Sequence, residues 1–216
     1  MRSIRKEPEP GDLRAHRATL GATYGNLTPE AKQSLREALV REQGHLCAYC
    51  MQRIEPTEAG MKIEHWSPQS EDSESQIDFR NLLGVCSGGM GRAQKHQHCD
   101  TSKANQGLWS HPADPGRNPE PSLRYLADGT MRALDERVSQ DIEVLNLNES
   151  AILTPNRRGA FSGFSEWLRR KGETKPGSWS RQTIERLLRE LVTPDASGKL
   201  RPFVGVGEHL LRKKLR

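Results

Sequence analysis

The chain has 216 residues, of which Leu, Ile, Val and Phe together make up 41, about 19%. At this fraction apolar burial barely outweighs chain entropy, so a large hydrophobic core is not expected. The net charge of +5 is too modest to indicate wholesale disorder. No apolar run approaches the roughly 20 residues of a membrane helix, and no apolar segment of a secretory signal follows the N-terminus. The sequence therefore predicts a cytoplasmic protein with no membrane partner.

The first predicted element is an irregular N-terminal arm over residues 1–27, where Pro, Gly and charged side chains follow no period. Thr28 and Pro29 are typical of a helix start, and the apolar spacing after them predicts a helix over 29–43. Later elements are a strand over 61–64, a polar loop over 67–78, a Gly-rich loop over 87–91, a helix from Thr101, a Pro-rich boundary over 110–122, a hairpin around Asp128-Gly129, helices over 154–171 and 180–191, and a basic amphipathic end from Gly207.

Positive charge gathers at the C-terminal end. Residues 157–216 contain 15 Lys or Arg and 6 Asp or Glu, a net charge of +9, whereas residues 1–156 carry −4. Such a run is typical either of a solvated helical surface or of a surface that binds DNA or RNA, and charge alone does not distinguish them.

Four cysteines, Cys47, Cys50, Cys86 and Cys99, indicate a metal site, because an intracellular chain uses cysteine more often as a ligand or free thiol than in a disulfide. The C-x2-C spacing of the first pair lets two thiolates on one turn reach a single zinc ion. Twelve residues separate the second pair, so His96 and His98 remain competing ligands, and Cys86 remains a candidate for simple apolar packing. Zinc would supply stability that the composition lacks, since its binding free energy in small domains is folding free energy.

A second group of chemically active residues lies between and beside the cysteines, in the order Glu64-His65, Asn81 and Asp100. Phosphodiester hydrolysis needs a base that deprotonates water, oxygen ligands for a hard cation, and a scaffold that holds both against a phosphate. Taken singly, a histidine after a strand is usually structural, and an asparagine before Leu-Leu is usually a turn or cap. The ordered set is what predicts a nuclease site.

The segments CAYC, KIEHW, RNLLGVC and HCDTSK, over residues 47–103, resemble the zinc-binding members of the HNH endonuclease family. A longer similarity, from REQGHLCAYC through LNLN at 145–148 to the C-terminal helices, is to the PtuB-like HNH nuclease subunit of Septu-type anti-phage systems, which also occur beside retrons. The resemblance implies an α+β fold. A zinc-stabilised ββα-metal core over residues 28–110, with an N-terminal helix, would precede a basic, mainly helical extension over residues 120–216.

By this likeness His65 is the general base, Glu64 and Asp100 hold a catalytic cation, and Asn81 braces the hairpin or orients His65. Glu64 stands where Asp is commoner, and Asp100 where His or Asn is commoner. Two carboxylates favour Mg²⁺ or Mn²⁺ over a softer metal. All four cysteines would hold a structural zinc ion.

The resemblance further implies a DNA substrate and an ABC- or SMC-like ATPase partner (PtuA-like), together with a reverse transcriptase and its RNA/DNA product where a retron is present. The candidate phosphate contacts are Lys103, Arg169, Arg170, Lys171 and Arg186. The candidate apolar anchors for docking are Trp167, Leu168, Leu187, Leu188 and Leu191. Two other functions stay open: a ribonuclease with the same residues, and a non-catalytic zinc module that docks a partner or nucleic acid and has no use for His65.

Overall fold

The computed structural model describes residues 1–70, 72–172 and 179–215. In chain order its helices and strands are α1 (Gly11–Arg17), α2 (Pro29–Glu42), β1 (Lys62–His65), β2 (Leu82–Val85), α3 (Asp100–Lys103), β3 (Leu123–Tyr125), β4 (Met131–Ala133), α4 (Glu136–Val144), α5 (Leu153–Arg170), α6 (Arg181–Leu191) and α7 (Val204–Arg212). Short 3-10 turns cover Glu74–Ile77, Phe79–Asn81, Gln94–His96, Pro115–Arg117, Glu120–Ser122 and Lys213–Leu215. None of the described helices is both long and apolar enough to cross a membrane.

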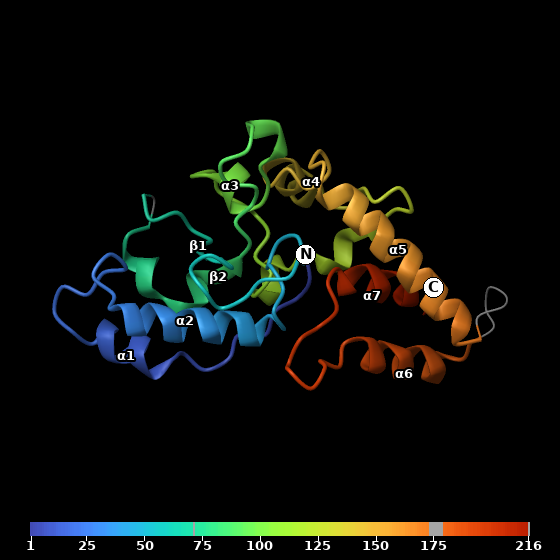
Figure 1. Ribbon diagram of the computed structural model, residues 1–216, viewed down its shortest axis with the longest axis horizontal. Helices are drawn as coiled ribbons and strands as arrows, with labels where there is room; N and C mark the ends of the chain where they lie inside the picture. The colour runs from blue at the N-terminus through green and yellow to red at the C-terminus, as the bar shows by residue number, and fades with distance from the viewer. Residues whose placement is uncertain (71, 173–178, 216) are drawn as a thin grey trace.

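The predicted α+β class is confirmed, with two small antiparallel sheets. β1 pairs with β2, and β3 pairs with β4. Figure 1 shows α1, α2 and the β1–β2 hairpin at one end of an elongated molecule, and α5, α6 and α7 at the other, with the N-terminus between them.

The N-terminal arm is not irregular throughout. Residues Gly11–Arg17 form α1, which buries Leu13. The next helix follows its sequence signals: the Thr28 hydroxyl accepts a hydrogen bond from Ala31 N at 3.1 Å, Pro29 occupies the first turn, and α2 ends at Glu42. The predicted helix over 29–43 is therefore confirmed, and the arm prediction is wrong at α1.

The predicted hairpin around Asp128-Gly129 is confirmed as the β3–β4 pair. Gly129 has a φ of +90°, and a Cβ there would lie 2.1 Å from Thr154 O, so only glycine fits this turn. The helices predicted over 154–171 and 180–191 correspond to α5 and α6. The short helix α4 lies outside the predicted elements.

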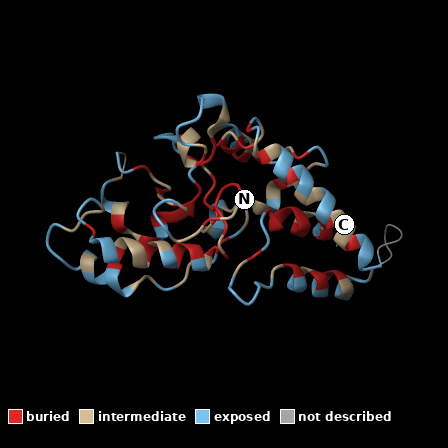
Figure 2. Cartoon of the chain, viewed as in Figure 1, coloured by how far each residue is buried: buried red, intermediate tan, exposed pale blue. Residues whose placement is uncertain are grey.

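The prediction that this composition builds no large apolar core is wrong. One cluster of buried apolar residues runs from Met1 to Leu211 and includes the four cysteines. In Figure 2 buried segments occupy the hairpin, the centre of the molecule and the inner faces of the C-terminal helices. Ala, Met, Tyr and Cys enlarge the core beyond the aliphatic residues and Phe counted in the sequence.

The C-terminal helix α7 belongs to this core. Its first turns are buried, from Val204 to Glu208, because Gly205 and Gly207 let it approach its neighbours closely. A Cβ on Gly205 would lie 2.8 Å from Met51 Sδ. The basic amphipathic end predicted from Gly207 is thus a central packing element whose basic residues lie only in its last turns.

Candidate functional site

The four cysteine sulfurs form one compact cluster, all within 4.8 Å of one another. The Sγ atoms of Cys47 and Cys99 are 3.9 Å apart, and those of Cys50 and Cys86 are 3.7 Å apart. A Zn–S distance of about 2.3 Å places the sulfurs of a tetrahedron about 3.8 Å apart. The cluster therefore fits a structural metal ion such as zinc.

All four thiols are buried, and their acidities diverge. Burial raises the pKa of the Cys50 and Cys99 thiols well above its usual value, whereas hydrogen bonds with the other thiols hold the pKa of Cys86 well below it. Four thiols at this spacing cannot all ionise without a cation among them. Cys86 does not simply pack as an apolar residue, because it belongs to this cluster.

Neither competing histidine belongs to the metal-sized cluster. His98 is buried beside it, with Nδ1 3.3 Å from Cys99 Sγ and 3.8 Å from Cys86 Sγ. The loop before it closes on itself, because His98 N donates to Gly88 O at 2.9 Å. Gly88 has a φ of +60° and leaves no room for a Cβ. The Gly-rich loop is thus an ordered connection between two cysteines.

A separate pocket of about 270 Å³ lies beside the end of β1 and the start of α3. Glu64, His65 and Asp100 all line it. The predicted helix from Thr101 is a single turn, because Ala104 adopts a φ of +49° and ends it. This turn brings Asp100 to the two residues that β1 carries, so three of the predicted site residues come together.

Glu64 is buried, with 5% of its surface exposed, and its Oε1 has two partners. The Tyr49 hydroxyl donates to it at 3.1 Å, and Lys103 Nζ lies 2.8 Å away. Burial, together with the neighbouring Asp100, raises the pKa of Glu64 to about 8. Lys103 is itself 1% exposed and also donates to His65 O at 3.3 Å. Lys103 also lines the pocket, where its ammonium pairs with Glu64, so its contact with a phosphate stays a prediction.

Asp100 faces both Glu64 and Lys62. Lys62 Nζ lies 2.9 Å from Asp100 Oδ2 and 3.0 Å from the Thr101 hydroxyl. Although burial opposes ionisation, hydrogen bonds with Glu64 and Lys62 hold the pKa of Asp100 below its usual value. The two carboxyl groups therefore differ in acidity: Asp100 ionises readily and Glu64 does not.

His65 is held as a neutral ring in one tautomer. Its Nε2 lies 2.9 Å from Gln76 O, a carbonyl that can only accept, so Nε2 carries the proton. Its Nδ1 then accepts a hydrogen bond from Gln69 Nε2 at 3.1 Å. Burial lowers the pKa of His65, which keeps the Nδ1 lone pair available. Tyr24 packs edge-on against the ring, with centroids 4.5 Å apart.

Asn81 lies outside the pocket lining and fixes the loop after β1. Its Oδ1 accepts from Ser67 N at 2.8 Å, and its Nδ2 donates to Ser67 O and Ser75 O at 3.2 and 3.1 Å. The same loop carries Gln69 and Gln76, both partners of His65. Asn81 therefore orients His65 indirectly.

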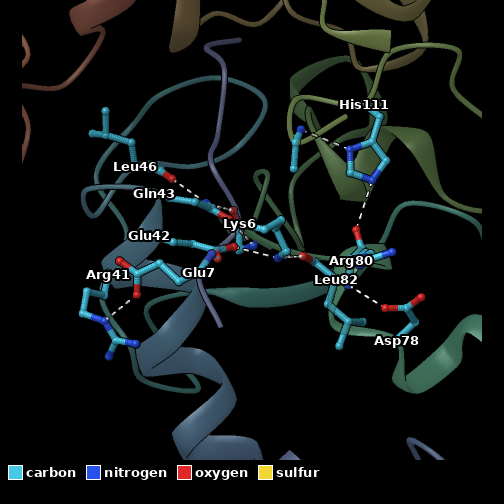
Figure 3. A network of polar contacts seen from close by, with 12 residues as sticks. Lys6, Glu7, Arg41, Glu42, Gln43, Leu46, Asp78, Arg80, Leu82 and His111 are labelled. Carbon is cyan, nitrogen blue, oxygen red and sulfur yellow. Dashed lines mark hydrogen bonds and ion pairs between the residues drawn. The ribbon is translucent and has the colours of Figure 1, made fainter. Parts of the chain in front are cut away.

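The N-terminal arm supports the hairpin from the other side (Figure 3). Lys6 Nζ donates to Glu42 Oε1 at 2.7 Å and to Leu82 O at 2.9 Å. Leu82 is the strand partner of His65. This contact joins the arm, α2 and the hairpin that carries the site.

The sequence identified Glu64, His65, Asn81 and Asp100 but not their partners Tyr49, Lys62, Gln69 and Gln76. Tyr49 lies within the CAYC turn, and Lys62 precedes Glu64 by two residues in the alternation of β1. Strand periodicity would have placed Lys62 on the same face as Glu64. The two glutamines lie in the loop over 67–78, where no periodic signal exists.

The basic residues Arg169, Arg170 and Lys171 lie at the exposed end of α5, away from the residues that line the pocket. Arg169 and Arg170 pair with Glu166, and Lys171 pairs with Glu190 at 2.6 Å.

Most of the predicted docking anchors face inward. Leu168, Leu187 and Leu191 are buried in the core of the chain itself, and Trp167 and Leu188 pack partly against it. The prediction that these three leucines anchor a partner is wrong, because the chain's own core already buries them.

No protein-family model matches this sequence, and no curated protein was found to be similar to it.

Proposed function

We propose that the chain is a metal-dependent endonuclease of the HNH type that hydrolyses phosphodiester bonds of DNA. The observation that carries the proposal is the convergence of Glu64, His65 and Asp100 on one pocket. They come from two separate segments, in the order hairpin then helix that a ββα-metal core requires. A zinc module that only docked a partner would have no use for this convergence.

In the proposed reaction His65 is the general base. Its Nδ1 lone pair accepts a proton from the attacking water once that water replaces the Gln69 amide. The Nε2–H bond to Gln76 O holds the ring during this transfer and stabilises the imidazolium that forms. The lowered pKa of His65 keeps the base unprotonated at neutral pH.

Glu64 and Asp100 are the residues that would hold a hard cation. Lys103 and Tyr49 contact only Oε1 of Glu64, and Lys62 contacts only Oδ2 of Asp100, so each carboxylate has a second oxygen without such a partner. Two interacting carboxyl groups favour either a shared proton or a cation between them, and oxygen donors suit Mg²⁺ or Mn²⁺. When bound, such a cation would stabilise the charge that develops on the phosphate and the leaving oxygen.

Arg169, Arg170 and Lys171 remain candidate phosphate contacts, as does Lys103, which lines the pocket. The side chains of Arg169 and Arg170 are 72% and 77% exposed, and exposed ion pairs such as theirs with Glu166 contribute little stability. A DNA phosphate can therefore replace Glu166 at small cost.

We also propose, from the family resemblance, that the nuclease acts in complex with an ABC- or SMC-like ATPase, in retron-associated systems together with the reverse transcriptase and its RNA/DNA product. Co-purification of the full-length chain with the ATPase at rising salt tests this. Apolar docking persists at high salt, whereas binding bridged by nucleic acid does not.

The activity test is incubation of the chain with plasmid DNA and with RNA, each with Mg²⁺ or Mn²⁺, alone and with the ATPase. His65→Ala should lower cleavage by about 10² to 10⁴. His111→Ala is the matched control, because His111 is also buried, donates from Nε2 to a carbonyl (Arg80 O, Figure 3) and lies outside the pocket lining. Equal losses in the two variants would contradict the role of His65. Cleavage of RNA but not of DNA would support the ribonuclease alternative instead.

A further inference from the structure

Arg157, on α5, is the largest of the fully buried side chains, with 1% of its surface exposed. Its Nη1 donates to Gly129 O at 2.7 Å, its Nη2 donates to Leu147 O at 3.0 Å, and its Nε has no partner. Over the described ranges, no carboxylate pairs with it. A buried charge without a counter-ion is costly, so the fold must supply negative charge nearby.

The cysteine cluster is one source of negative charge that acts on Arg157. Leu147 lies two residues after Leu145, whose carbonyl accepts a hydrogen bond from Cys99 N at 2.9 Å. One short segment therefore accepts hydrogen bonds from both the guanidinium and the backbone of a cysteine ligand. Burial lowers the pKa of Arg157. Tyr125 and the thiols of Cys50 and Cys99 act in the opposite direction and raise it.

We propose that Arg157 is the counter-charge of the four-thiolate zinc centre. A zinc ion with four thiolates carries a net charge of −2, and a guanidinium beside it offsets half of that buried charge. The inference rests on the proposed zinc site. It makes Arg157 a positioning residue for the centre, supplied by the C-terminal region.

A merely structural role for Arg157 would consist of tying the β3–β4 turn to the LNLN segment. Asn148 forms a comparable pair of hydrogen bonds, without a charge, between the same two segments. Its Nδ2 donates to Met131 O at 2.8 Å, and its Oδ1 accepts from Met131 N at 2.9 Å. Asn148→Ala therefore removes comparable hydrogen bonds without changing the charge near the cysteines.

The test compares Arg157→Gln, Arg157→Lys and Asn148→Ala with the wild type. Zinc affinity is measured by competition with a chromophoric chelator, and melting temperature is measured in excess zinc. We expect Arg157→Gln to weaken zinc binding at least tenfold, about 1.4 kcal/mol. Arg157→Lys should stay within a few-fold of the wild type, and Asn148→Ala should lower the melting temperature without lowering zinc affinity.

Equal loss of zinc affinity in Arg157→Gln and Asn148→Ala would overturn the proposal, as would wild-type affinity in Arg157→Gln. If Arg157→Gln does not fold, Arg157→Lys decides. It keeps the charge but cannot bridge both carbonyls as the guanidinium does, so wild-type-like affinity supports the counter-charge role and a tenfold loss refutes it. Absence of zinc from the wild type would instead refute the zinc site itself, and the inference with it.

Discussion

The raised pKa of Glu64 predicts how the free energy of unfolding depends on pH. Its pKa is raised from 4.5 to about 8, so the stability it contributes is complete below pH 4.5 and is lost as the pH rises through 8. With these two values, linkage gives a loss of about 3.5 kcal/mol of unfolding free energy between pH 5 and pH 8. Glu64→Gln mimics the protonated carboxyl and should lack this loss. His65, whose lowered pKa gives the opposite trend, is present in both proteins and cancels in the comparison.

The assay is urea unfolding, followed by tryptophan fluorescence, of both proteins at several pH values from 5 to 8, with zinc but without Mg²⁺. The two should be equally stable at pH 5, and Glu64→Gln should be more stable at pH 8 by about 3 to 4 kcal/mol. Added Mg²⁺ at pH 8 should stabilise the wild type more than Glu64→Gln. Glu208→Gln, which changes another buried carboxyl far from this pocket, should respond to Mg²⁺ like the wild type. Parallel pH curves for wild type and Glu64→Gln would refute the reasoning.

Three further predictions follow from the two clusters. Cys86→Ser should lose zinc on metal analysis and lower the melting temperature by about 10 °C or more, because zinc binding contributes folding free energy. Full zinc content and an unchanged melting temperature would contradict the four-cysteine site. Asp100→Asn should lower Mg²⁺-dependent cleavage by about 10²-fold or more while leaving the zinc content unchanged. An unchanged cleavage rate in this variant would contradict Asp100 as a ligand of the cation. Lys103→Met removes the ammonium that favours the ionised form of Glu64, so it should raise the pKa of Glu64 further and shift the pH-dependent loss of unfolding free energy to higher pH in urea unfolding; an unchanged pH dependence would contradict the pairing.

Local signals predicted the elements that have local causes. The Thr28-Pro29 start and the Asp128-Gly129 turn each fix the backbone through contacts within a few residues, and each element formed where expected. Helix α4 also has a local cap, because the Asp135 side chain accepts from Arg137 N at 2.9 Å. The predicted elements nevertheless include no helix at this position.

The features that the sequence did not predict are contacts between distant segments. The pair of Lys103 with Glu64 joins β1 to α3, and nothing in the spacing around Lys103 shows that its ammonium is buried. The leucines of α5 and α6 have the pattern of an amphipathic face, but the sequence does not say whether a partner or α7 covers that face. Gly207 allows α7 to pack there, because a Cβ at this position would lie 2.9 Å from both Leu191 Cδ2 and Phe164 Cδ1.

The C-terminal region supports both turns of the cysteine cluster. Asn146 Nδ2 donates to Gln97 O at 2.6 Å, which holds the end of the loop before Cys99. Phe203 N donates to Met51 O at 3.0 Å, directly after the C-x2-C turn. A chain cut after residue 122 would lose both contacts, so failure of such a fragment to bind an ATPase would report a damaged zinc site as readily as a missing docking surface. Partner binding is therefore to be tested on the full-length chain, with substitutions confined to exposed side chains.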